Sequence, residues 1–213
     1  MRTIRFEKLQ RVLCLGAHSD DIEIGCGGTL LKLAAEHPRL EILWVVFSAE
    51  GPRRAEAEGS AKAFLRDARR SRVLVQDYRG SFFPFQGELI KEFFETLKPF
   101  RPDLVLTHYR DDRHQDHRVI SDLSWNTFRD HAILEYEILK YDGDLGIPNV
   151  FVPSPRALAA RKTALLMKHF KTQTGRHWFT PDAFAALHRI RGIESASPTG
   201  LAEAFHGRKI VLG

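Results

Sequence analysis

The sequence predicts a three-layer α/β fold, in which a doubly wound, mostly parallel sheet carries helices on both faces. Short apolar segments rich in Val, Ile and Leu recur along the first half of the chain, and segments with a helical pattern separate them. Continuous apolar runs of this length are typical of strands buried on both faces of a parallel sheet. Alternating strands and helices form right-handed βαβ units, which gives a Rossmann-like arrangement.

The individual elements follow from these patterns. Strands are expected at residues 12–17, 41–48, 72–76 and 103–107. Helices are expected at residues 27–37, 53–70 and 86–99, the last of them closed by Pro99 and Pro102. The second half is less regular, with helices expected at 114–130, 156–170 and 181–190, a strand at 133–141, and a loop at 142–155 with an extended piece at 150–152. Because no repeat or linker interrupts this order, we expect a single domain over residues 1–213.

Composition narrows the class of protein. The chain has 213 residues, 43% of them hydrophobic, which suits one domain with a sizeable core. Its net charge is +5, but the basic residues are spread without a long run, so we expect no nucleic-acid partner. Cys14 and Cys26 form no disulfide framework, which favours a cytoplasmic location. No segment approaches 18 consecutive apolar residues, so no membrane span or signal peptide is expected.

A first polar cluster, His18, Asp20 and Asp21, follows the first expected strand. Ligands bind at this carboxyl edge in open α/β sheets. Neighbouring carboxylates repel one another, and a divalent cation would remove that cost. Imidazole and carboxylate groups suit zinc. Two alternatives stay open: the aspartates can cap a helix, and glycines 25, 27 and 28 can belong to a phosphate loop, although their spacing is not G-x-G-x-x-G.

A second polar cluster follows the strand expected at 103–107, where residues 108–117 include three histidines and three aspartates. His114 and His117 are three residues apart at a helix start and so share one face. Asp116 can accept a ring N–H from a neighbouring imidazole. A solvated polar helix start is the alternative. Because both clusters follow strands of one parallel sheet, they can meet at one edge and supply the two-histidine, one-carboxylate set of a catalytic zinc site.

These positions resemble the PIG-L/LmbE-like family of zinc-dependent N-acetylglucosamine deacetylases. Residues 17–28 read AHSDDIEIGCGG beside the family motif A-H-P-D-D-x-E-x-G-x-G-G, and residues 114–117 read HQDH beside H-x-D-H. Residues 53–57, RRAEA, fit a third element in which Arg precedes x-x-E-A. The similarity spans roughly the first 130 residues in order and spacing. Ser19 replaces the family Pro, a residue that would stiffen the turn without a chemical role.

The resemblance implies one Zn²⁺ per chain, or another divalent transition metal, and a role for each matching residue. These roles are metal binding by His18, Asp21 and His117; general base catalysis by Asp20; oxyanion stabilisation or protonation of the leaving amine by His114; orientation of that imidazole by Asp116; and substrate contact by Arg53, with Arg54 close enough to compete.

The expected reaction is removal of an N-acetyl group from an amino sugar or its conjugate, whether free, nucleotide-linked or lipid-linked, by an amidohydrolase. Residues 131–213 carry no family motif and are expected to shape the substrate pocket. The alternatives are a related zinc amidase acting on a thiol or other glycoside conjugate, a phosphoesterase that would draw on Asp111 and Asp112, and a metal- or sugar-binding module without activity. The resemblance also implies a homo-oligomer.

Overall fold

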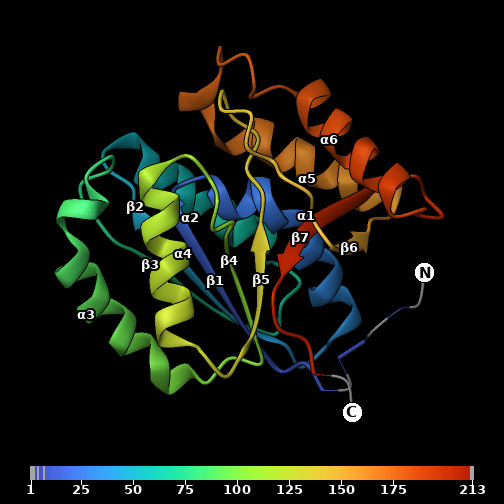
Figure 1. Ribbon diagram of the computed structural model, residues 1–213. Helices are drawn as coiled ribbons and strands as arrows, with labels where there is room; N and C mark the ends of the chain where they lie inside the picture. The colour runs from blue at the N-terminus through green and yellow to red at the C-terminus, as the bar shows by residue number, and fades with distance from the viewer. Residues whose placement is uncertain (1–2, 4, 7, 212–213) are drawn as a thin grey trace.

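The computed structural model describes residues 3, 5–6 and 8–211, and within them seven strands form one sheet in the order β3-β2-β1-β4-β5-β7-β6 (Figure 1). The strands are β1 (Arg11–His18), β2 (Glu41–Ser48), β3 (Arg70–Val75), β4 (Leu104–His108), β5 (Ala132–Tyr136), β6 (Val150–Pro153) and β7 (Ala202–Gly207). Strands β1 to β5 pair in parallel, whereas β7 pairs antiparallel with both β5 and β6. The predicted mostly parallel sheet is therefore confirmed.

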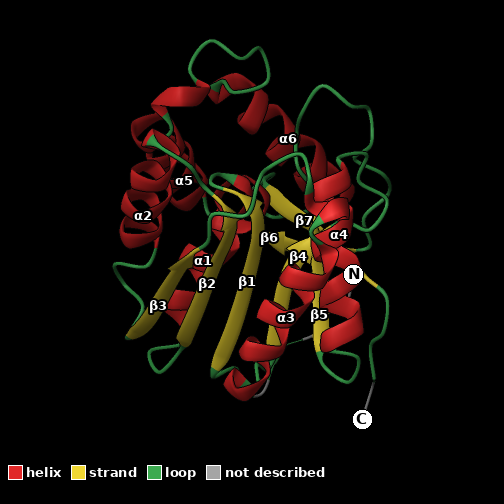
Figure 2. Ribbon diagram, turned by 90° about the vertical axis from the view of Figure 1, so that its left-hand side faces the viewer, coloured by secondary structure: helices red, strands yellow, loops and turns green. Residues whose placement is uncertain are grey.

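Helices cover both faces of this sheet, as predicted (Figure 2). They are α1 (Asp21–Glu36), α2 (Pro52–Phe64), α3 (Gly87–Leu97), α4 (Gln115–Thr127), α5 (Arg156–His169) and α6 (Pro181–Glu194), with short 3-10 turns at Phe83–Phe85, Lys98–Phe100 and Lys171–Gln173. Alternate residues of β1 divide between two cores: Val12 and Cys14 pack with α1, α2, α5 and α6, and Leu13 and Leu15 pack with α3 and α4. This alternation follows from the period of two residues along a strand.

Three boundaries differ from the sequence prediction by five residues or more. Helix α1 begins at Asp21 rather than at residue 27, because packing overrides the weak helix propensity of its glycines. Helix α2 ends at Phe64, six residues before its expected end, and β5 ends at Tyr136 instead of 141. Strand β7 was not predicted, since its AEAFHG sequence interrupts the apolar pattern with a glutamate and a histidine.

The glycines of the first motif allow close helix packing. A Cβ atom on Gly25 would lie 2.1 Å from the Tyr136 ring, and one on Gly27 would lie 2.6 Å from Phe64. A Cβ on Gly28 would lie 2.9 Å from Glu203. All three glycines are buried inside α1, so the phosphate-loop hypothesis is wrong. Their absence of side chains lets the sheet, α2 and β7 hold α1 at close range and thereby fix its first residues.

Among residues 3, 5–6 and 8–211, no helix combines the length and apolarity that a membrane crossing requires. The cytoplasmic location and the homo-oligomer stay predictions.

Candidate active site

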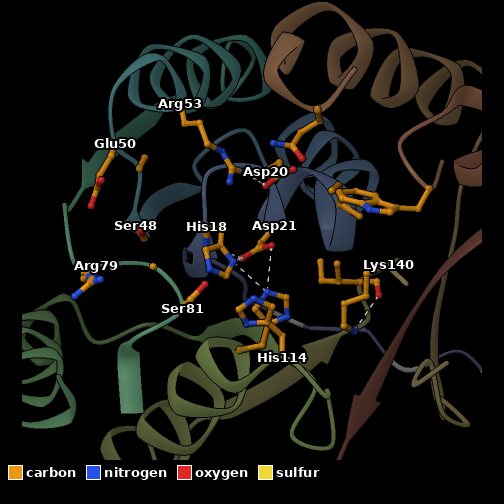
Figure 3. Close-up of a pocket in the computed structure, with 17 residues that line it drawn as sticks. His18, Asp20, Asp21, Ser48, Glu50, Arg53, Arg79, Ser81, His114 and Lys140 are labelled. Carbon is orange, nitrogen blue, oxygen red and sulfur yellow. Dashed lines mark hydrogen bonds and ion pairs between the residues drawn. The ribbon is translucent and has the colours of Figure 1, made fainter. Parts of the chain in front are cut away.

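The two polar clusters meet at the carboxyl edge of β1 and β4, as the sequence predicted. His18 is the last residue of β1, Asp21 is the first of α1, and His117 lies in the first turn of α4. His18 Nδ1 lies 3.2 Å from His117 Nε2 and 3.4 Å from Asp21 Oδ2. His117 Nε2 lies 3.5 Å from Asp21 Oδ1. Figure 3 shows His18 and Asp21 directed toward one another at the centre of the pocket.

These three side chains fit a divalent cation. Ligand atoms about 2.0–2.1 Å from a tetrahedral zinc ion lie about 3.3–3.4 Å from one another. The three contacts between His18, Asp21 and His117 measure 3.2–3.5 Å, with His18 nearest to Asp21 Oδ2 and His117 nearest to Asp21 Oδ1. Two imidazoles and one carboxylate are also the donor set of many catalytic zinc sites, in which a fourth position faces the substrate. Burial of Asp21 and His117 shields the site from bulk water.

Two other groupings of donor atoms lie within 4.8 Å of one another: His18 with His114 and His117, and Asp21 with His108 and His117. His108 is less available than the others, because it is fully buried, does not line the pocket and accepts the Ala17 N–H on its Nε2 at 2.9 Å. Sequence reasoning gave His108 no role. His108 is the last residue of β4, and its ring stacks on the ring of His117. Its position at a strand end was the sequence feature that could have identified it.

The charges around the site favour a cation. Burial opposes a charge on His18, but the carboxylates of Asp21 and Asp116 outweigh that effect and raise the pKa of His18 to about 10. Burial and the neighbouring His108 lower the pKa of His117 to about 3. Burial would raise the pKa of Asp21, but the surrounding histidines hold it well below its usual range. A divalent ion here would take the place of the His18 proton.

A buried carboxylate orients His117. Asp112 Oδ2 accepts a hydrogen bond from His117 Nδ1 at 2.9 Å, which directs Nε2 toward His18 and Asp21. Lys140 donates to the same Asp112 oxygen at 3.0 Å and to Asp144 at 2.7 Å. The sequence suggested Asp112 only for a phosphoesterase, and no motif pointed to Lys140, which lies in the loop after β5.

The contacts of Asp116 differ from those expected. Its carboxylate accepts the Ser81 N–H at 2.5 Å and the Phe83 N–H at 3.2 Å, and lies 3.1 Å from His18 Nε2. Only its backbone N–H meets His114, donating to Nδ1 at 3.2 Å. The cause is the helix start: His114 is the N-cap of α4 and turns its ring back over the first N–H groups. Asp116 therefore orients the His18 ring by its carboxylate.

The buried Asp20 pairs with the half-buried Arg53 beside the three candidate metal ligands. The guanidinium of Arg53 donates to Asp20 Oδ1 at 2.8 Å, and both residues line the pocket. Arg54 instead donates to the Val75 carbonyl at 3.0 Å and does not line the pocket, so the geometry favours Arg53 as the substrate contact. Burial raises the pKa of Asp20, and Arg53 opposes that rise.

The pocket above these residues has a volume of about 520 Å³. Its walls come from the ends of β1 and β2, from α1 and α2, from residues 79–81 and from α4. The C-terminal region contributes the remaining described lining residues, which are Ile138, Lys140, Gln173 and Trp178. This volume lies in the range of small-molecule sites.

Fold and site together define an α/β protein with a pocket whose His and Asp side chains could hold a metal ion, and comparison with known families is consistent with that class. Residues 13–128, more than half of the chain, match PIG-L: GlcNAc-PI de-N-acetylase, and the chain belongs to this family. The predicted family is therefore confirmed.

Individual relatives include deacetylases. Diacetylchitobiose deacetylase from Thermococcus kodakarensis is 28% identical over 110 residues, which cover 47% of this chain and 41% of the relative. The chain thus spans about two fifths of that relative's length. The structure of N,N'-diacetylchitobiose deacetylase from Pyrococcus horikoshii superposes with a TM-score of 0.74 at 20% identity, covering 95% of this chain and 85% of that one.

A second structure shows that the fold alone does not decide the reaction. The 4-carboxy-2-hydroxymuconate hydratase from Pseudomonas putida KT2440 has a TM-score of 0.73 at 16% identity, and the match covers 96% of this chain and 98% of that one. At these identities the likeness establishes the fold, and the reaction has to be argued from the residues of the site.

Proposed function

We propose that this protein is a metal-dependent deacetylase, folded as a single domain over residues 1–213, that removes the N-acetyl group from an amino sugar or its conjugate. The observation that carries the proposal is the convergence of His18, Asp21 and His117 beneath a pocket that Asp20 and His114 also line. Membership of a de-N-acetylase family and the deacetylases among its relatives support this reaction. Zn²⁺ is the ion we expect.

His18, Asp21 and His117 would hold the ion. When bound, the ion supplies a Lewis acid that polarises the amide carbonyl and lowers the pKa of water. Asp112 and Asp116 would keep the two imidazoles in the orientation that binding requires, through their contacts of 2.9 Å and 3.1 Å.

Asp20 is proposed as the general base. It is adjacent to Asp21 in the chain, is buried at 4% exposure and faces the pocket. Arg53 fixes one of its oxygens at 2.8 Å and leaves the other available to accept a proton from the attacking water. The guanidinium favours the ionised carboxylate that a base needs, and it opposes the burial that raises the pKa of Asp20.

His114 is proposed as the hydrogen-bond donor to the oxyanion. Its Nδ1 accepts the backbone N–H of Asp116, so the proton of the neutral ring is placed on Nε2. Because His114 lines the pocket, that N–H can stabilise the developing oxyanion of the acetyl group. The proton that Asp20 takes from the attacking water then passes to the leaving amine, so the ring of His114 stays neutral.

The proposal is tested by acetate release from a panel of free, nucleotide-linked and lipid-linked N-acetyl amino sugars, with thiol-conjugate amides as a further arm. We expect Asp20→Asn to lower kcat by about 10²–10⁴-fold at unchanged metal content, because it removes the base and leaves the proposed ligands. Arg54→Gln is the matched control, since Arg54 lies next to Arg53 but outside the pocket. Absence of acetate release from every amide, or an Asp20→Asn enzyme at the wild-type rate, would contradict the proposal.

A further inference from the structure

The loop between β3 and the 3-10 turn at Phe83–Phe85 is held rigidly at the rim of the pocket. Gln86 clamps the backbone of Arg79 on both sides: its amide oxygen accepts the Arg79 N–H at 3.2 Å, and its amide nitrogen donates to the Arg79 carbonyl at 2.8 Å. Two residues further on, Ser81 adopts a left-handed φ of 65°. Its N–H is tied to Asp116 at 2.5 Å, so the loop is also fixed to the residue that contacts His18.

The Arg79 side chain is positioned but not neutralised. Its guanidinium carbon lies 3.6 Å from the centre of the Phe82 ring. No carboxylate of the described residues lies within ion-pair distance of it, including the exposed Glu50 on the same rim. Figure 3 shows Arg79 and Glu50 on one side of the pocket and Lys140 on the other.

The other cationic side chains of the pocket are already paired. Arg53 donates to Asp20 at 2.8 Å, and Lys140 donates to Asp112 at 3.0 Å. Among the described residues that line the pocket, Arg79 is thus the one lysine or arginine side chain without an ion-pair partner in the protein. Left-handed backbone at a serine costs free energy and tends to persist where a functional site requires it.

We propose that Arg79 is a specificity-determining residue that binds an anionic group, phosphate or carboxylate, on the part of the substrate that projects past Gly80 and Ser81. This inference rests on the proposed function and adds a charge to its substrate class. A guanidinium offers a planar pair of N–H donors that matches both groups. Glu50 would repel an anion placed elsewhere along this rim, which confines the group to the Arg79 side.

The test compares kcat/KM for N-acetylglucosamine 1-phosphate, with its phosphate on C1, for N-acetylmuramic acid, with its carboxylate on the O3 ether, and for methyl N-acetylglucosaminide as the neutral reference. We expect at least one anionic substrate to be preferred, and Arg79→Gln to lower the ratio of anionic to neutral kcat/KM by about tenfold to a hundredfold. Arg79→Lys should recover part of the ratio, because it keeps the charge but not the planar fork. Arg54→Gln, the same change outside the pocket, should leave the ratio within about twofold of wild type.

The outcomes separate this inference from the proposed function. If acetate is released but the ratio is the same in wild type and Arg79→Gln, the Arg79 assignment is overturned and the deacetylase proposal stands. If no acetate is released, the deacetylase proposal falls, and calorimetric binding of glucosamine 1-phosphate decides the assignment of Arg79. Binding at least tenfold weaker in Arg79→Gln supports it, and equal binding, or none to the wild type, overturns it. Circular dichroism of each variant confirms that the fold is retained.

Discussion

Glu203 on β7 joins the C-terminal region to the helix that carries Asp21, and its removal should destabilise the protein strongly. Its Oε1 accepts the Gly28 N–H at 2.8 Å and the Lys162 ammonium at 2.5 Å, and its Oε2 accepts the Thr29 N–H at 2.6 Å. Lys162 also donates to the Ile24 carbonyl at 2.6 Å. Both charged side chains are 3% exposed. Glu203→Gln leaves the shape nearly unchanged but removes the charge that balances Lys162.

The size of the effect follows from burial. Breaking a buried ion pair by removing one partner costs about 3–5 kcal/mol, because the remaining charge is left uncompensated. The new amide nitrogen also faces at least one backbone N–H in place of an acceptor. We therefore expect Glu203→Gln to lower the free energy of unfolding by about 3–5 kcal/mol at pH 7, a large share of the 5–15 kcal/mol typical of a domain.

The same contacts give the loss a defined pH dependence. Burial would raise the pKa of Glu203, but Lys162 and His188 outweigh it and hold that pKa well below its usual range. A carboxyl whose folded pKa is depressed stabilises the protein above its unfolded pKa of about 4.3, and this contribution is lost as the pH falls toward the folded value. The difference between wild type and Glu203→Gln should thus be complete at pH 7 and shrink below about pH 4.

Urea unfolding followed by circular dichroism, at pH 7 and at pH 3.5, measures both quantities. The double variant Lys162→Met/Glu203→Gln is the matched control, and it should be more stable than Glu203→Gln because it removes the unpaired ammonium. A Glu203→Gln variant within about 1 kcal/mol of wild type at pH 7 would refute the reasoning, since a buried ammonium cannot lose its counter-charge at so small a cost.

Three further outcomes are expected. Gly25→Ala should lower Tm and reduce the free energy of unfolding by at least about 1–3 kcal/mol, because the new Cβ would lie 2.1 Å from Tyr136. The control Gly87→Ala, whose Cβ would have no atom within 4 Å, should leave Tm nearly unchanged. Equal Tm shifts would mean that close packing does not require Gly25. Asp112→Asn should weaken metal affinity about 10–100-fold in a chelator competition, because Asp112 holds the ring of His117. Asp122→Asn, a change at an exposed residue, should alter the affinity little. Unchanged affinity in Asp112→Asn would mean that Asp112 does not orient His117. Chelation should abolish acetate release and added Zn²⁺ restore it, and activity that persists in protein shown to hold no metal would contradict the metal's role.

The fold was predictable from sequence where a strand is buried along nearly its whole length. Strands β1, β2 and β4 are continuous apolar runs, and each is found within one or two residues of its predicted range. The start of α1 was missed because glycines at 25, 27 and 28 argue against a helix unless their packing partners are known. Strand β7 was missed because Glu203 interrupts its apolar pattern. Glu203 is buried there because it accepts backbone N–H groups of α1, which lie 174 residues away in the chain and cannot be inferred from local sequence.

The site was predictable as far as its motifs reach. His18, Asp20 and Asp21 follow one strand and His114 and His117 another, so the topology alone brings them together. The residues that orient them were not predictable. Asp112 shares its cluster with other aspartates, and Lys140 reaches it from a loop without a motif. The carboxylate of Asp116 contacts His18 because of the geometry of the α4 N-cap, which sequence spacing does not specify.

The proposed reaction depends on one metal ion bound between the first and second polar clusters. Anomalous diffraction from crystals of the purified, zinc-loaded protein, recorded on both sides of the zinc absorption edge, would locate that ion. We expect a single strong peak within about 2.0–2.2 Å of His18, Asp21 and His117, facing Asp20 and the pocket. A peak held by His108 in place of His18, or no peak at this edge of the sheet, would contradict the assignment of the metal ligands.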